Sequence, residues 1–275
     1  TLVQVPLAAA AVPAFGRAVS GLPAWLHSGL RAALTLRPVD LVLVYFLFCN
    51  RDMAAEARAV YRRLAAGDLE GARLRVGRIV GRDTGELDSR GVIRAAVESV
   101  AESLVDGVGA PLLYLVLGGA PLAYAYRTVN TIDSRFGYRD RRYERFGKAG
   151  ARLDDLLNFV PSRLNALFLF AASGMDPRVW RSMRRFGRKH PSPNSGIAEA
   201  GFAGALGMAL GGPSRYGGVL EDRPVLGRDR LSEEELDDPR LILQAVALYW
   251  RVTAVSLACH AALLVLPALP LFGAP

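Results

Sequence analysis

The sequence predicts an all-α, polytopic integral membrane protein with polar helices and loops on the cytoplasmic side. Three observations predict this fold class. First, 51% of the residues are hydrophobic although 22% are charged, and the two kinds are segregated into blocks. Second, several long stretches carry no charge, and a spanning helix needs about 20 mostly apolar residues. Third, no stretch alternates polar and apolar residues as a half-buried strand would.

The main apolar segments are expected at 107–128, 156–175 and 241–275, the last as a helical hairpin that turns near its prolines. The run 41–49 is too short to span a membrane unless it extends back through Arg37 and Asp40. A soluble α-protein with buried core helices remains the alternative, but one globule of 275 residues can hardly cover several such runs. We therefore expect residues 1–275 to form a single membrane-embedded domain with four or five apolar helices.

A cytoplasmic helical portion is predicted for residues 50–106. An amphipathic helix over 50–68 ends at Gly67, and a second, short helix follows over 69–81. Asp88 or Ser89 then caps a helix from about 90 to 105. The apolar stripe of that last helix consists of Val92, Ala96, Val100 and Leu104.

The chain is basic, with a net charge of +8 and a pI near 9.9. Its Lys and Arg residues gather at 134–152 and 178–190. In a membrane protein such loops mark the cytoplasmic side, and they can hold anionic substrates or lipid headgroups. The sequence shows no zinc spacing, helix-turn-helix pattern or base-stacking motif. We therefore expect a lipid bilayer as partner and no nucleic acid.

Three acids, Glu98, Glu102 and Asp106, stand four residues apart just before an uncharged segment. This spacing places them with Arg94 on one slowly drifting stripe of the predicted helix. A solvated face with an ordinary Arg94–Glu98 pair is the simple interpretation. Like charges at this spacing repel unless a cation lies between them, and carboxylates that share a hard cation suit magnesium. The stripe therefore predicts a magnesium site formed by the three acids.

Residues 130–168 form the densest polar stretch. Capping and turn formation explain its first group well, which consists of Asn130, Thr131, Asp133 and Ser134. Capping and turn formation explain the second group less well, because it borders apolar residues. Polar groups near membrane depth are usually functional. That group comprises Asp154, Asp155 and Asn158 within one helical turn, flanked by Arg152 and Arg163. An intrahelical charge pair that orients the helix remains open for Arg152.

The stretch 189–218 is rich in glycine. "PSPNSG" predicts a turn, and the Gly/Ala-rich helix after it permits close helix packing. The pairs Gly211-Gly212 and Gly217-Gly218 would let the backbone approach a phosphate, although no P-loop is present. His190 is interpreted as a loop histidine rather than a base.

Five blocks then follow in a distinctive order: "VGRDT", "RAAVESVAES..DG..AP", "YRTVNTIDSRFGY", "RYERFGKAGARLDDLLNFVPSRL" and "HPSPNSGIAEAGFAGALGMALGGPSRYGG". In this order the chain resembles the adenosylcobinamide-phosphate synthase family of cobalamin biosynthesis (CobD/CbiB type), over about residues 50–220. Two departures stand out. Ser103 replaces the usual Asn, and Arg135 replaces an apolar residue such as Met. The family's N-terminal segment with a His-Pro motif is also not visible.

The resemblance implies a multi-pass protein of the cell membrane with an amide-forming ligase activity. In that family, aminopropanol or its phosphate is joined to the propionate carboxylate of adenosylcobyric acid with ATP and magnesium. Other membrane proteins of the cobalamin pathway are further expected partners. Amide formation needs an activated acyl group, most simply an acyl phosphate made from ATP. Such chemistry calls for magnesium ligands, cations on the phosphates and a pocket that excludes water.

The motifs imply two sets of site residues. The expected catalytic residues are Glu98, Glu102, Asp106, Asp154 and Asp155. The residues expected to bind substrate or phosphate are Arg82, Asp83, Thr84, Asn130, Thr131, Asp133, Ser134, Arg152, Asn158, Arg163, Ser192 and Asn194. A non-catalytic membrane sensor or transport-associated protein on the same scaffold is the alternative, and the intact acids in the three blocks argue against it.

Overall fold

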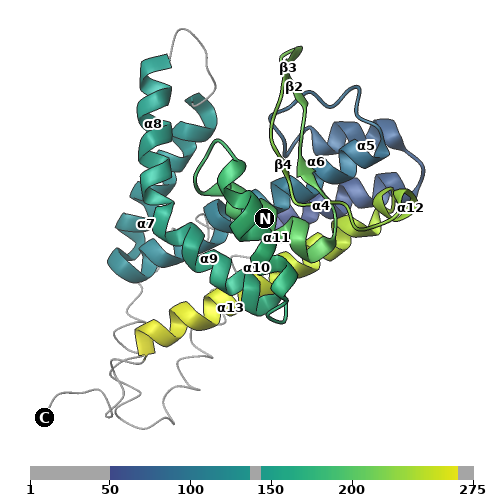
Figure 1. Ribbon diagram of the computed structural model, residues 1–275. Helices are drawn as coiled ribbons and strands as arrows, with labels where there is room; N and C mark the ends of the chain where they lie inside the picture. Colours follow the sequence, from purple (N-terminus) through teal and green to yellow (C-terminus); the bar gives the residue numbers. More distant parts are fainter. Residues whose placement is uncertain (1–49, 137–143, 266–275) are drawn as a thin grey trace, which may run out of the picture.

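The computed structural model describes residues 50–136 and 144–265, and these residues are mainly helical (Figure 1). The predicted apolar run 41–49, the rest of the region before residue 50 and the chain after residue 265 lie outside the described residues. The helices are α4 (Asn50–Ala65), α5 (Leu69–Val76), α6 (Ser89–Leu104), η1 (Val105–Gly109), α7 (Ala110–Phe136), α8 (Glu144–Leu157), α9 (Phe159–Ala172), α10 (Pro177–Phe186), η2 (Gly187–Lys189), α11 (Ser195–Leu206), α12 (Glu233–Leu236) and α13 (Arg240–Val265).

The two predicted helices are present as α4 and α5, although α5 ends at Val76 and not near residue 81. Gly67 has a positive φ of 73° after the end of α4, a conformation that glycine adopts without steric cost. Asp68 then caps α5 by accepting a hydrogen bond from the Gly71 backbone N–H. Ala57 and Val60 on α4 and Ala72 on α5 are fully buried, so the predicted apolar faces of the two helices meet the core.

Helix α6 runs through the centre of the core. Asp88 caps it by accepting from the Gly91 N–H at 2.7 Å, as the sequence predicts. The expected stripe of Val92, Ala96, Val100 and Leu104 is at most 1% exposed. Helices α4, α5, α11 and α13 all contact α6. One face of α6 is left to line the cavity described below.

Helix α7 is not one straight helix, and this corrects the expectation of a spanning helix over 107–128. Its backbone leaves helical geometry at Gly118 and at Gly119, where φ is 66° and ψ is −165°. The rings of Tyr114 and Tyr126 stack with centroids 5.1 Å apart, although 12 residues of straight helix would separate them by about 18 Å. The chain therefore folds back into a helical hairpin at the two glycines.

The turn before this hairpin is a π-helix, η1, which contains Asp106. Short π-helical turns are rare and occur frequently at functional sites. The turn is held closely against α9, since a Cβ atom on Gly109 would lie 1.6 Å from the Asn165 amide nitrogen. The glycine is therefore needed for the approach of the two segments.

Helices α10 and α11 form the closest packed pair of the structure's second half. Gly204 on α11 faces the Ser182 Cβ and the Val179 backbone of α10, where a Cβ would lie only 2.7 to 3.0 Å away. Gly196 similarly approaches the Gly187 carbonyl oxygen. The prediction of close packing along the Gly/Ala-rich helix is therefore confirmed.

Four short strands correct the all-α expectation: β1 (Leu210–Gly211), β2 (Ser214–Tyr216), β3 (Val219–Glu221) and β4 (Val225–Leu226). They form two antiparallel pairs, β1 with β4 and β2 with β3. Glycines with positive φ at 217 and 218 make the tight turn between β2 and β3. In Figure 1 the β2–β3 hairpin projects beside α6.

Within the described residues, two helical stretches are long and apolar enough to cross a membrane, Ser89–Ser134 and Arg240–Leu263. The first of them contains the π-helical turn and the hairpin, and so does not cross as a straight rod. Helix α9 is a shorter apolar helix. Large hydrophobic side chains lie exposed on α7, α9, α10 and α13, among them Leu117, Phe159, Leu167, Trp180 and Leu257.

Candidate active site

A cavity of about 1240 Å³ lies between α6, η1, α7, α8, the loop before α11 and the β-strand segment. It brings together ten of the predicted site residues, which are Arg82, Glu98, Glu102, Asp106, Asn130, Asp133, Ser134, Asp154, Asp155 and Ser192. These residues come from all three polar blocks of the sequence. The acidic stripe and the 130–158 block therefore share one site.

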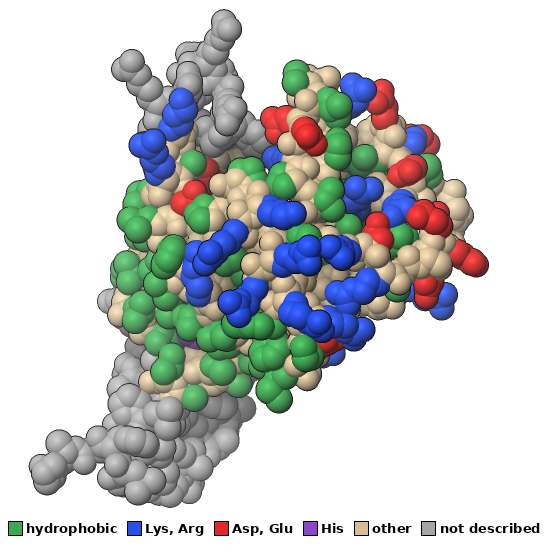
Figure 2. All heavy atoms as spheres, in the orientation of Figure 1, with side chains coloured by type: hydrophobic (Ala, Val, Ile, Leu, Met, Phe, Trp, Pro, Cys, Tyr) green, Lys and Arg blue, Asp and Glu red, His purple; other side chains and the backbone are tan. Residues whose placement is uncertain are grey.

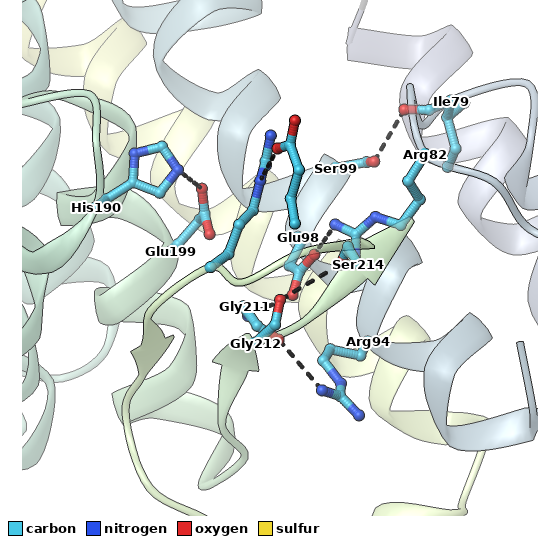
Figure 3. Close-up of polar contacts among 12 residues, drawn as sticks. Ile79, Arg82, Arg94, Glu98, Ser99, His190, Glu199, Gly211, Gly212 and Ser214 are labelled. Atoms are coloured by element: carbon cyan, nitrogen blue, oxygen red, sulfur yellow. Dashed lines mark hydrogen bonds and ion pairs between the residues drawn. The ribbon is translucent and has the colours of Figure 1, made fainter. Parts of the chain in front are cut away.

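Glu98 lies deep in this cavity wall, and its carboxylate is fully engaged (Figure 3). One oxygen accepts from the Arg82 guanidinium and the other from the Gly211 backbone N–H. Burial lowers the pKa of Arg82, but the charge of Glu98 and the hydrogen bond to it outweigh that effect and hold the pKa above its usual value. Arg94 does not form the expected pair with Glu98 and donates to the Gly211 carbonyl oxygen at 3.2 Å.

This arrangement corrects the role predicted for Glu98. Each carboxylate oxygen already accepts from a buried guanidinium or a backbone N–H, so a metal ion would have to compete with both partners. Arg82 also donates to the Ser214 hydroxyl at 3.2 Å, so the pair ties the strand segment to α6. Glu98 is thus a positioning residue of the cavity wall.

Asp106 belongs to a second polar cluster, centred on Asn158. The Asn158 amide donates to Asp106 at 3.2 Å and to Asp154 at 2.9 Å. Its carbonyl oxygen accepts from the Tyr126 hydroxyl at 3.0 Å. Asp154 also accepts from Asn130 at 3.2 Å. The predicted convergence of Asp154 and Asn158 is present, and it joins η1 and the second arm of the α7 hairpin to the end of α8.

Asp154 is 8% exposed, and burial raises its pKa, although the hydrogen bonds from Asn130 and Asn158 lower it. Arg127 brings the nearest positive charge of this cluster. Its guanidinium donates to the Asn130 side chain at 3.1 Å and to the Asp106 carbonyl oxygen at 3.2 Å. The cluster therefore combines two carboxylates with one guanidinium at the cavity wall.

Asp155 anchors a third cluster around the loop before α11. It accepts from the Ser192 hydroxyl at 2.8 Å and from the Asn194 amide at 3.2 Å. Asn194 in turn accepts from Arg163 at 2.6 Å and from Ser162 at 3.1 Å. Ser192 reaches the cavity, whereas Arg163 and Asn194 lie behind its lining and position the loop.

Seven predicted binding residues do not line the cavity: Asn158, Arg163 and Asn194, which belong to the clusters above, and four others. Asp83 accepts from the backbone N–H groups of Gly217 and Gly218, at 3.2 and 2.7 Å, and so occupies the glycine turn where a phosphate was expected. Thr84 is half-buried beside Gly77. Thr131 is exposed and donates to the Arg127 carbonyl oxygen at 2.8 Å. Arg152 is exposed on α8.

Glu102 is the carboxylate of the stripe that is open to the cavity. It is exposed and accepts no hydrogen bond from the described residues, unlike Glu98 one turn earlier. Its charge repels that of Asp133, and the charges of Asp106 and Asp154 repel each other. Arg223 offsets part of the repulsion at Glu102, and Arg127 part of that at Asp106. Acids gathered in this way favour bound cations.

The arrangement of the acids can be compared with the predicted magnesium site of Glu98, Glu102 and Asp106. Among the described residues, no group of three or more His, Cys, Asp or Glu side chains is arranged to hold a metal ion, so the predicted three-acid site is not formed. Magnesium usually keeps several waters and takes one or two carboxylates together with substrate phosphates. Glu102 and Asp106 have the right chemistry for that substrate-bridged mode, and the cavity wall nearby carries Arg82, Arg127 and Arg223.

His190 and Glu199 form a pair in the cavity that the sequence interpretation missed (Figure 3). The Ser192 backbone N–H donates to His190 Nδ1 at 3.0 Å, and His190 Nε2 lies 3.7 Å from Glu199 Oε1. Burial lowers the pKa of His190 and raises that of Glu199 well above its usual value. A single carboxylate inside the apolar stretch "GIAEAGFAGA" was the signal that could have found Glu199.

Comparison with known proteins identifies the family. The family model described as CobD/Cbib protein matches residues 1–249. The chain belongs to the CobD/CbiB family. A cobalamin biosynthesis protein CobD of Geobacter metallireducens is 45% identical over 239 residues, which cover 84% of this chain and 71% of the relative. No solved structure matches the chain.

Two further relatives agree with this family assignment. The cobalamin biosynthesis protein CbiB of Salmonella arizonae is 42% identical over 224 residues, covering 80% of this chain and 69% of the relative. A CobD of Leptospira interrogans is 42% identical over 212 residues, covering 74% and 67%. As a CobD/CbiB protein, the chain has its role in cobalamin biosynthesis. The clusters around Glu98, Asn158 and Asp155 therefore line or support the large cavity of a CobD/CbiB protein.

Proposed function

We propose that this CobD/CbiB protein joins aminopropanol, or its phosphate, to the propionate carboxylate of adenosylcobyric acid in an ATP- and magnesium-dependent amide ligation. The cavity carries this proposal. Its volume of about 1240 Å³ exceeds that of sites for drug-sized ligands, which hold about 300–1,000 Å³, and so suits a corrin macrocycle with a second substrate. Acids and guanidinium groups line it together, as phosphate chemistry with a divalent cation requires.

The residues have distinct proposed roles. Glu102 and Asp106 hold magnesium, and Arg127 and Arg223 lie where they can neutralise phosphate oxygens. ATP with magnesium supplies the activation of the propionate carboxylate. Asn158 fixes both Asp106 and Asp154 by donating a hydrogen bond to each, and the η1–α7 hairpin is proposed to shield that wall from water. Water exclusion matters because an activated carboxylate would otherwise hydrolyse.

The amine must lose a proton before it can attack, and Glu199 is the proposed acceptor. Burial raises its pKa, and a carboxylate with a raised pKa is a stronger base. His190 holds it from one side, since the Ser192 N–H on Nδ1 leaves the proton of the neutral ring on Nε2, facing Glu199. In this proposal His190 orients and Glu199 transfers the proton.

The proposed setting is the cell membrane, with several crossings and the cavity open to the cytoplasm. The two long apolar stretches and the exposed hydrophobic side chains on α7, α9 and α13 support membrane contact. The excess of Lys and Arg in the polar segments supports the cytoplasmic orientation.

Purified full chain in neutral detergent tests the reaction directly. With ATP and magnesium it should consume adenosylcobyric acid and either aminopropanol or its phosphate, with release of one phosphate product per amide. Parallel reactions with the two amines decide which one is the substrate. Corrinoid binding without ATP-dependent consumption of either amine would overturn the ligase and favour the non-catalytic sensor or transport-associated protein.

A matched pair of variants tests the metal role. Glu102→Gln should raise the magnesium concentration needed for half-maximal turnover on the order of 10- to 100-fold, while the melting temperature stays unchanged. Glu234→Gln makes the same charge change on the exposed side of α12, away from the cavity, and should leave the requirement unchanged. An unchanged requirement in Glu102→Gln would remove this residue from the metal site.

A further inference from the structure

A second, smaller cavity of about 370 Å³ lies between α10 and the segment after β4. It shares no lining residue with the large cavity. Five of its seven lining residues are arginines, and the full lining is Arg178, Arg181, Ser182, Arg185, Phe186, Arg228 and Arg230. The proposed ligation uses none of them.

The charges of this arginine cavity are mostly unneutralised. Asp176 pairs with Arg178 at 2.6 Å, which accounts for one of the five guanidinium groups. Asp229 lies between Arg228 and Arg230 in the sequence but does not pair with either of them. It pairs with Arg90 at 2.9 Å and accepts a hydrogen bond from the Ala209 N–H at 2.7 Å. No carboxylate of the described residues pairs with the remaining four guanidinium groups, which belong to Arg181, Arg185, Arg228 and Arg230.

Ser182 supplies an independent observation. Ser182 is one of the lining residues of the arginine cavity and is 5% exposed; its Cβ lies against Gly204 of α11, and its Oγ has no hydrogen-bond partner in the described structure. A buried hydroxyl without a partner is costly, so its presence calls for an explanation. A bound acceptor in the cavity would satisfy the hydroxyl and the guanidinium groups together.

Apolar side chains lie exposed on α10 itself and on the neighbouring helix α9. Trp180, on α10, is 37% exposed and packs on Phe170 of α9 with ring centroids 5.4 Å apart. Leu167 on α9 and Met175 before α10 are exposed as well. Figure 2 shows Lys and Arg side chains gathered over the middle of this face, where Figure 1 places α10, with hydrophobic side chains directly below them. Tryptophan and arginine at such a border are typical of a membrane surface.

We propose that the arginine cavity binds a phosphate group, supplied by an anionic phospholipid at the membrane surface. Arginine grips phosphate oxygens in a bidentate fork, and the Ser182 hydroxyl donates to a further oxygen. The adjoining exposed side chains of Trp180 and Leu167 lie where the acyl chains of such a lipid would run. Free phosphate has the same chemistry, and the experiment separates the two sources.

The test uses the full chain in neutral detergent and brominated short-chain phosphatidylglycerol, whose bromines quench the fluorescence of a nearby tryptophan such as Trp180. Brominated phosphatidylcholine and inorganic phosphate serve as comparison ligands. Arg181→Gln/Arg185→Gln should raise the dissociation constant for phosphatidylglycerol about tenfold or more, a loss of about 1.4 kcal/mol. Ser182→Ala should weaken binding without any change in charge.

The control is Arg184→Gln/Arg188→Gln, which removes two charges from exposed arginines next to the cavity that do not line it. It should change the dissociation constant less than about twofold, as expected of solvent-exposed charges that do not touch the ligand and are screened by salt. Inorganic phosphate that displaces the lipid at low concentration would support the phosphate site and identify free phosphate as the ligand. Equal losses in the two double variants, or unchanged binding in Ser182→Ala, would overturn the proposal, because the surface would then attract lipids by net charge alone.

Discussion

Replacement of Glu98 by Gln separates the two roles that this acid could have. The change keeps the size of the side chain and removes its charge. In the structure Glu98 accepts from Arg82 and from the Gly211 backbone, and the Arg82 and Glu98 side chains are 12% and 7% exposed. Glu98→Gln therefore leaves a buried guanidinium without its counter-charge.

The expected loss of stability is large because the Arg82 and Glu98 side chains are both poorly accessible to water. Removal of one partner of a buried ion pair costs about 3–5 kcal/mol. The whole free energy of unfolding of a domain is only about 5–15 kcal/mol. Glu98→Gln should therefore lose a large share of the stability, and with it the attachment of β1 to α6 through Gly211.

Thermal unfolding and protease resistance in detergent measure this loss. The double variant Arg82→Met/Glu98→Met should recover most of it, because apolar residues of similar volume can replace a buried pair. Glu86→Gln is the control, since Glu86 pairs with Arg215 on the surface and the two side chains are 82% and 51% exposed. Wild-type stability in Glu98→Gln together with a raised magnesium requirement would refute this reasoning and return Glu98 to the metal site.

Three further changes test other parts of the structure. Burial raises the pKa of Glu199, so wild-type stability should fall as the pH rises from about 4.5 towards the raised pKa, by at most about 1.4 kcal/mol per pH unit. Glu199→Gln should remove the contribution of Glu199 to that decline, whereas the effect of His190, whose pKa is lowered, is the same in both proteins. Parallel curves of melting temperature against pH for the two proteins would contradict the burial of a titrating acid at this position. Gly119→Ala should cost about 1–3 kcal/mol, since φ 66° with ψ −165° is a conformation for glycine, and unchanged stability would argue against the α7 hairpin. Tyr126→Phe should cost about 1 kcal/mol through the lost bond to Asn158, and an unchanged melting temperature would show that this bond contributes nothing.

Local patterns predicted the first part of the fold well. The Asp88 cap and the apolar stripe of α6 depend on residues three or four positions apart, and those relations are visible in a sequence. That cap, that stripe and the end of α4 near Gly67 followed from them.

The hairpin of α7 could not be predicted in the same way. A charge-free stretch has the same composition whether it runs straight or folds back at Gly118 and Gly119, and hydropathy does not distinguish the two. What decides is packing between distant positions, such as Tyr114 on Tyr126 and the Tyr114 hydroxyl on the Leu157 carbonyl oxygen at 2.7 Å. The two-residue strands β1 and β4 were also too short to show any alternation.

The acidic stripe shows why spacing predicted a shared face but not a shared role. Glu98, Glu102 and Asp106 are chemically alike, yet each meets different partners from remote segments. Arg82 and Gly211, which lie 16 and 113 residues away along the chain, neutralise and bind Glu98. Glu102 meets no such donor and stays open to the cavity.

The third acid departs from the stripe because the helix itself changes. Asp106 lies in the π-helical turn η1, where the wider turn shifts its direction relative to the i+4 stripe of α6. That shift carries Asp106 towards Asn158 and Tyr126, at 3.2 and 3.5 Å, instead of along the row. Helical periodicity therefore placed the three carboxylates at one cavity, while the assignment of ion pair, open acid and hydrogen-bonded acid depends on tertiary contacts and on one irregular turn.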